Sequence, residues 1–172
     1  MKTLIAWFSW SGNTEKIARQ IAAKTGGDLF RIERETPYST DYNTCAYTEA
    51  KEEADKHLRP AIVRPLPDIS QYDTIIVAFP IWWYTSPMPV TTFLESYPDW
   101  NRKRMYIFAN SYSDIPSQFV NAVRDAMASA RGADVRPGLY NKDIGKLDKW
   151  LRDNRLLTGK AEIGRASCRE RV

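Results

Sequence analysis

The chain has 172 residues, of which 43% are hydrophobic and 27% charged, and a formal net charge of +4. This length suits one domain with a sizeable core, in the composition range of water-soluble globular proteins. The charges are scattered, which argues against a nucleic-acid partner, and no apolar run reaches the ~18 residues that cross a bilayer, so we expect no membrane partner either.

The first informative stretch is an apolar strand over residues 3–8, followed directly by a polar turn over residues 9–14 and an amphipathic helix. The turn consists of Ser9, Trp10, Ser11, Gly12, Asn13 and Thr14. Backbone N–H groups at a helix start carry partial positive charge and bind phosphate well, and hydroxyl and amide groups add donors. Glycine lets the backbone come close or take positive φ. The turn therefore favours a phosphate site, although the same residue types also suit an ordinary helix cap.

Two better-known phosphate motifs do not fit this turn. No Gly-Lys-Ser/Thr follows it, so it is not a Walker loop, and its single glycine does not make the dinucleotide fingerprint. The helix that follows places Ile17, Ala18, Ile21 and Ala22 on one face, and Gly26-Gly27 predicts its end.

The middle of the chain predicts an edge strand and then a buried one. Residues 28–33 alternate polar and apolar, as a half-exposed edge strand does, and residues 42–58 favour a charged surface helix. Residues 73–79 are almost continuously apolar, which is typical of a strand covered on both faces. A short helix is expected over residues 90–96.

The last third repeats the alternation of strand and helix. Residues 104–109 predict a strand, and a helix from about Pro116 carries apolar side chains at helical spacing that we expect in the core: Phe119, Val120, Val123 and Met127. A short strand is expected near residues 133–135. Asp143 is expected to cap a last helix that turns Ile144, Leu147 and Leu151 inward.

This β-α alternation predicts an α/β fold with a doubly wound parallel sheet and helices on both faces. Ligands bind such sheets beyond the carboxyl ends of the strands, so the loops at 9–14, 80–84 and 110–114 should converge. The second loop supplies Pro80, Trp82, Trp83 and Tyr84, and the third Asn110, Ser111 and Tyr112. A ligand with one phosphate and a flat ring would use both features, because aromatic side chains stack on planar rings. The alternative is that the tryptophans only pack against neighbouring helices, or that Tyr112 is a surface residue.

Taken together, several motifs resemble the flavodoxin-like proteins, in particular the short bacterial group. The motifs are Ser9-x-Ser11-Gly12-Asn13-Thr14, the strand 72–76, Pro80-Ile81-Trp82-Trp83, and the segments 87–90 and 92–95, and the resemblance covers residues 1 to about 157. It implies a five-stranded sheet in the order 2-1-3-4-5 and one non-covalent FMN. By position, Ser9, Ser11, Asn13 and Thr14 would hold the phosphate, and Pro80, Trp82 and Trp83 would face the isoalloxazine ring.

The chain departs from the pattern of this group in two loops. Tyr84 stands where the group usually has glycine after the paired tryptophans, and residues 110–114 replace a loop that is usually rich in glycine and serine. Flavodoxins that carry electrons are also strongly acidic, whereas this chain is weakly basic.

The leading hypothesis is therefore an FMN flavoprotein that transfers electrons to a partner protein or reduces a small acceptor such as a quinone. An alternative is a binding module of the same fold that has lost its flavin. A phosphate-binding hydrolase is disfavoured, because we find no Ser-His-Asp, Cys-His or paired-carboxylate constellation. His57, the single histidine, is expected to be solvated and to bind no metal.

The domain is expected to span residues 1–157, with a tail from 158 to 172. Residues 162–172 show no periodicity, and one back-translation of them resembles a common sequencing adapter, so we interpret them as non-native. Only two cysteines occur, Cys45 and Cys168, which fits a reducing compartment and a cytoplasmic location.

Overall fold

The computed structural model describes residues 2–113 and 115–158. The expected non-native segment at 162–172 lies outside these residues. Within them, five parallel strands form one sheet in the order β2-β1-β3-β4-β5, as the sequence predicts. The strands are β1 (Lys2–Trp7), β2 (Asp28–Arg31), β3 (Tyr72–Pro80), β4 (Arg104–Asn110) and β5 (Asp134–Tyr140).

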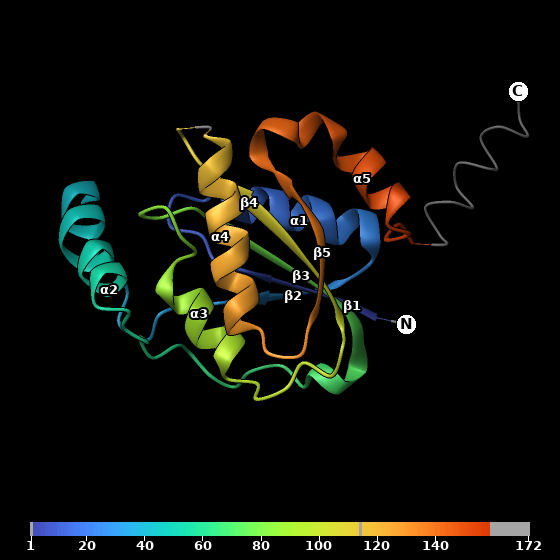
Figure 1. Ribbon diagram of the computed structural model, residues 1–172, viewed down its shortest axis with the longest axis horizontal. Helices are drawn as coiled ribbons and strands as arrows, with labels where there is room; N and C mark the ends of the chain where they lie inside the picture. Colours follow the sequence, from blue (N-terminus) through green and yellow to red (C-terminus); the bar gives the residue numbers. More distant parts are fainter. Residues whose placement is uncertain (1, 114, 159–172) are drawn as a thin grey trace, which may run out of the picture.

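Helices cover both faces of this sheet, as right-handed crossovers require. The α-helices of the structure are α1 (Asn13–Thr25), α2 (Lys51–Asp55), α3 (Met88–Glu95), α4 (Pro116–Ser129) and α5 (Leu147–Asp153), and all but α2 pack on the sheet. Figure 1 shows α3 and α4 in front of the sheet and α1 and α5 behind it, whereas α2 stands apart beyond the carboxyl ends of the strands.

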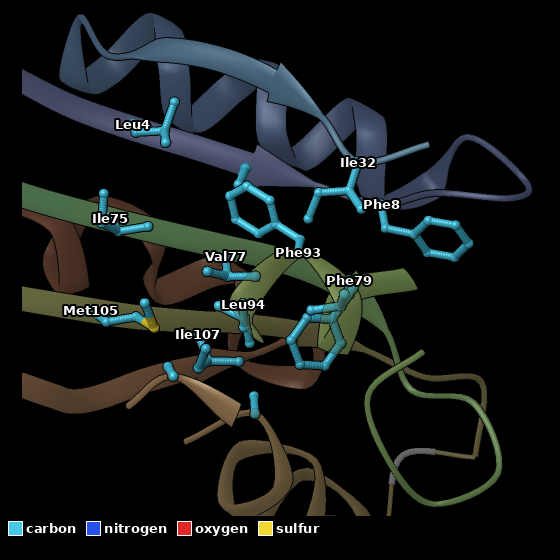
Figure 2. Packing of buried hydrophobic residues seen from close by; sticks show 14 of the residues in the cluster. Leu4, Phe8, Ile32, Ile75, Val77, Phe79, Phe93, Leu94, Met105 and Ile107 are labelled. Carbon is cyan, nitrogen blue, oxygen red and sulfur yellow. The ribbon is translucent and has the colours of Figure 1, made fainter. Parts of the chain in front are cut away.

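Alternate residues of the central strands bury on opposite faces, because successive side chains of a strand point to opposite sides. Toward α3 and α4 the strands present Leu4, Ile75, Val77, Met105 and Ile107, which pack with Phe93 and Leu94 of α3 (Figure 2). Toward α1 and α5 they present Ile5, Ile76, Tyr106 and Phe108. The sheet therefore has a core on each face, which explains the nearly continuous apolar sequence of β3.

The register brings the carboxyl ends of the three central strands to one edge. Trp7 of β1 pairs with Ala78 of β3, and Ala78 pairs with Phe108 of β4. The loops that leave these strands consequently start side by side.

Strand β5 is longer than the short strand expected near residues 133–135. Pro137 and Gly138 lie inside this strand, at a shift in its register with β4. A Cβ atom at Gly138 would lie 2.1 Å from the carbonyl oxygen of Ile107, so the close approach of β4 requires glycine there.

Two expectations about the last helices are wrong. Val120 and Met127 of α4 are exposed, and the helix instead buries Ala122 and Ala126, whose small side chains let it pack close to the sheet. Asp143 caps no helix: it lies within a 3₁₀ segment, Asn141–Lys146, and α5 begins only at Leu147. The expected burial of Leu147 and Leu151 is confirmed.

The connection between β2 and β3 contains less α-helix than expected. A π-helix spans Thr44–Ala50 and continues into the short helix α2. His57, beyond the end of α2, is exposed as predicted. No helix in residues 2–113 and 115–158 is long and apolar enough to cross a membrane.

Candidate functional site

A cavity of about 630 Å³ lies where the three strand-end loops meet. Of the predicted site residues, only Gly12 is missing from its lining, and Gly12 lies in the turn at 9–14. The predicted residues that line the cavity are Ser9, Trp10, Ser11, Asn13, Thr14, Pro80, Trp82, Trp83, Tyr84, Asn110, Ser111 and Tyr112. The predicted convergence of the three loops is thus confirmed. A cavity of this size falls within the ~300–1,000 Å³ that small-molecule sites occupy.

The start of α1 leaves its first N–H groups without a side-chain cap. Gly12 occupies the N-cap position with φ of 96°, a left-handed conformation that favours glycine, and none of the described side chains caps the helix there. Ser9 Oγ instead accepts a hydrogen bond from the Gly12 N–H at 3.0 Å. The ordinary-cap interpretation therefore fails, and the first turn can offer its N–H groups to an anion.

Hydrogen bonds tie the three loops together. The Thr14 hydroxyl, which is buried, donates to Asn110 Oδ1 at 2.6 Å, and the Ile81 N–H donates to the Asn110 carbonyl oxygen at 2.8 Å. Asn110 thus joins the first and second loops from the third. Thr14 therefore links the first loop to the third, and its predicted role in holding a phosphate stays a prediction.

Trp82 and Trp83 have different surroundings. Trp82 packs edge-on against Phe8 and Tyr38, with ring centroids 5.1 and 5.2 Å away. Trp83 donates its indole N–H to the Ala46 carbonyl oxygen at 2.7 Å. Trp82 therefore fits the packing alternative as well as the lining role, while Trp83 joins the second loop to the segment before α2.

The turn around Trp83 holds two neighbouring residues in left-handed conformations. Trp83 has φ of 51° and Tyr84 has φ of 67°, and Trp82 and Thr85 close the turn by exchanging backbone hydrogen bonds of 3.0 and 3.1 Å. Such turns usually carry asparagine or glycine, since a side chain in this conformation costs about 1–2 kcal/mol. The chain thus keeps a glycine-like backbone at Tyr84 without the glycine, and strain of this kind clusters at functional sites.

The third loop is the most exposed of the three. Tyr112 is 92% exposed, and Asn13 Nδ2 donates to its hydroxyl at 3.5 Å. Ser113 connects the loop to α4 through Gln118 Oε1, at 3.0 Å from its hydroxyl. A smaller cavity of about 260 Å³ adjoins this loop and is lined in part by Lys16 of α1.

Sequence reasoning missed a further wall of the cavity, which we call the 39–55 segment. It contributes Tyr42, Cys45, Ala46, Tyr47 and Ala50 to the lining. Sequence analysis assigned most of this segment to a surface helix. No local pattern in the sequence signals this wall, because Tyr47 lies in the π-helix and Tyr42 precedes it.

A partly buried ion network anchors this segment to the chain that follows β2. The Arg34 guanidinium lies 4.3 Å from the Tyr38 ring centroid, 3.5 Å from a Glu49 carboxylate oxygen and 3.7 Å from a Glu53 carboxylate oxygen. The Tyr38 hydroxyl donates to Glu53. Burial raises the pKa of Glu53 above its ordinary value, and burial also raises the pKa of Tyr38. The network holds the segment over the cavity with few exposed charges.

Known proteins of similar sequence and structure place the chain in a family. A family model described as Flavodoxin matches residues 2–154. A crystal structure from Bacteroides eggerthii, assigned as a flavoprotein, is 28% identical with a TM-score of 0.75, covering 88% of this chain and 96% of its own. Another from Bacteroides uniformis, also assigned as a flavoprotein, is 29% identical with a TM-score of 0.73, covering 88% and 97%.

A third similar structure contains a ligand. It is a flavoprotein from Lactobacillus acidophilus solved in complex with FMN, 25% identical with a TM-score of 0.70, covering 87% of this chain and 97% of its own. No protein of curated function matches the chain. The family match over most of the chain, with the sheet order and the strand-end cavity, shows that this chain belongs to the flavodoxin family.

Proposed function

We propose that this chain is an FMN-dependent redox protein that passes electrons to a small acceptor or to a partner protein. The observation that carries the proposal is the uncapped start of α1 facing the same cavity as an aromatic second loop. One side of that cavity suits a phosphate and the other suits a flat ring. FMN binding by the Lactobacillus acidophilus flavoprotein supports this assignment.

The residues present fit FMN by the chemistry of their donors. Ser9, Ser11 and Asn13, with the first N–H groups of α1, would hold the phosphate, while Thr14 positions this turn through Asn110. Lys16, in the adjoining cavity, adds a positive charge on the phosphate side. Bound FMN supplies reversible electron transfer, and the protein binds and orients it.

The ring would lie against the second and third loops. Pro80 lines that part of the cavity from the end of β3, Trp82 and Trp83 line it from the second loop, and Tyr112 lines it from the third loop. The Trp83–Ala46 hydrogen bond fixes the indole plane before any ligand arrives, which reduces the entropy lost on binding.

The test is a titration of the purified protein with FMN and with riboflavin, which lacks the phosphate. We expect a yellow protein, submicromolar FMN affinity and weaker riboflavin affinity. The Ser11→Asp variant places a carboxylate in the phosphate turn, where it would repel the phosphate of FMN. It should weaken FMN binding at least tenfold and leave the affinity for riboflavin unchanged. Ser117→Asp, an exposed serine in the first turn of α4, is the matched control and should change neither.

Two results would reject the assignment. A colourless protein that takes up no FMN would favour a binding module without flavin, and equal FMN and riboflavin affinities would reject the phosphate turn. Mixing the FMN-loaded protein with NADPH then separates an enzyme from a carrier: rapid bleaching of the flavin bands indicates a reductase, and no bleaching indicates a carrier that needs a partner protein.

A further inference from the structure

Four aromatic side chains that line the cavity contact one another in a row, and two of the four come from outside the three strand-end loops. Tyr47 lies edge-on to Trp83 with centroids 5.5 Å apart, Tyr42 lies 6.4 Å from Tyr47, and Trp10 lies 6.1 Å from Tyr42. Two members, Tyr42 and Tyr47, come from the 39–55 segment. We call Trp10, Tyr42, Tyr47 and Trp83 the aromatic wall.

The two tyrosines of this wall are exposed, although their rings are largely apolar. Tyr42 is 59% and Tyr47 58% exposed, and both line the cavity. Hydrogen bonds hold the two indoles of the wall in place. The Trp10 indole N–H donates to the Ser39 carbonyl oxygen, and the Trp83 indole N–H donates to the Ala46 carbonyl oxygen. Exposed apolar surface gathered in a concave site is typical of a ligand-binding site.

The wall is also uncharged. None of the described residues that line the cavity is Asp, Glu, Lys, Arg or His. The nearby Lys51 ammonium, 5.6 Å from the Trp83 ring centroid, is paired with Asp55 at 2.6 Å. A charged ligand would therefore lose its hydration here without gaining a counter-charge.

We propose that Tyr42 and Tyr47, next to the Trp83 that lines the flavin side of the cavity, form a subsite for a neutral, planar aromatic acceptor such as a quinone. The proposal rests on the proposed function, because it names the acceptor that the FMN site would serve. An edge-on aromatic wall suits a flat neutral ring, which gains stacking and burial without a desolvation penalty. A phosphorylated or sulfonated ring lacks a partner on this side of the cavity.

The experiment measures binding without turnover on the oxidised, FMN-loaded protein. Menadione is the neutral probe and its sulfonated analogue the charged one, and quenching of tryptophan fluorescence reports both. We expect menadione to bind at least tenfold more tightly than the sulfonate. Tyr47→Ala should weaken menadione about tenfold, whereas Tyr47→Phe keeps the ring and should bind as the unaltered protein does.

FMN affinity, measured in parallel, separates this proposal from the one it rests on. We expect the FMN affinities of Tyr47→Ala and Tyr42→Ala to stay within about twofold of that of the unaltered protein, while both variants bind menadione more weakly. Unchanged menadione binding in both variants, or equal binding of menadione and sulfonate, overturns the subsite and leaves the exposed rings to a different partner. Loss of FMN in proportion to menadione also overturns it, because the rings would then belong to the flavin site. Failure of the unaltered protein to bind FMN overturns the proposed function instead.

Discussion

The two ends of the sheet each carry a turn with two neighbouring residues of positive φ, and the turns differ in composition and surroundings. Beyond the carboxyl end of β3, the turn is Trp83-Tyr84, with φ of 51° and 67°. Before the amino end of β4, it is Asn101-Arg102, with φ of 52° and 58°. Asparagine tolerates this conformation, so the second turn follows ordinary turn chemistry at one of its two positions, whereas the first turn follows it at neither.

The surroundings explain the difference. At the amino end, the Asn101 N–H donates to Asp99 Oδ1 at 2.8 Å, the Arg102 N–H donates to the Gly132 carbonyl oxygen at 2.8 Å, and Trp100 is fully buried. At the carboxyl end, Trp83 and Tyr84 line a cavity, and Tyr84 is 61% exposed. At the amino end, the turn and the residues around it stabilise the fold. At the carboxyl end, the strained backbone of the turn presents two aromatic side chains to the cavity.

The largest expected contrast is between the two tryptophans. Trp100→Ala should lower the free energy of unfolding by about 3–5 kcal/mol, because it leaves a cavity and removes the indole hydrogen bond to the Leu94 carbonyl oxygen. Trp83→Ala, at a half-buried site, should cost about 1–2 kcal/mol. Urea unfolding measures both, and FMN titration should show weakened binding only for Trp83→Ala. Equal losses of stability would remove the distinction between the two ends.

The next contrast uses two buried threonines at opposite ends of α1. Thr14 donates to Asn110 Oδ1 at 2.6 Å, whereas Thr25 donates to the Ile21 carbonyl oxygen at 2.8 Å and accepts a hydrogen bond from the Gly27 N–H at 3.2 Å. Replacement of either by valine should cost about 1–2 kcal/mol, since each removes a buried hydrogen bond at nearly constant volume. Only Thr14→Val should weaken FMN binding, by about fivefold, because it breaks the hydrogen bond between the phosphate turn and the third loop. A matching loss in Thr25→Val would mean that FMN affinity follows global stability alone.

The smallest expected effect concerns backbone strain in the two turns. Tyr84→Gly and Arg102→Gly each relieve a positive φ, but glycine also loses more freedom on folding. We expect both to raise the free energy of unfolding by ~0.5 kcal/mol, seen as a small shift of the thermal midpoint. A clear destabilisation by Tyr84→Gly alone would show that the tyrosine side chain stabilises its turn more than its backbone strains it.

Local sequence predicted the elements that depend on near neighbours. The continuous apolar pattern of β3 reflects two buried faces, and the mixed polar and apolar pattern of β2 fits an exposed edge strand; both are properties of a few successive residues. The patterns failed where a tertiary contact overrides them. Gly138 lies in a strand because β4 approaches it, and Val120 is exposed because Ala122 and Ala126 face the sheet.

The candidate site likewise has one part that the local sequence predicts and one part that depends on tertiary contacts. The three loops could be predicted because each follows a recognisable strand, and parallel strands end at a common edge. Tyr42 and Tyr47 could not, because no local pattern says where a long connection between strands folds back.

The doubly wound sheet and the polar turn between β1 and α1 follow from the residue pattern, because periodicity and turn chemistry act over a few residues. Long-range packing is what leaves α1 uncapped at Gly12, gives Trp83 and Tyr84 a left-handed backbone, and brings the 39–55 segment to one side of the cavity. The bond from Trp83 to Ala46 joins residues 37 positions apart. Contacts of that range form only when the whole chain packs, so they decide which side chains meet a ligand.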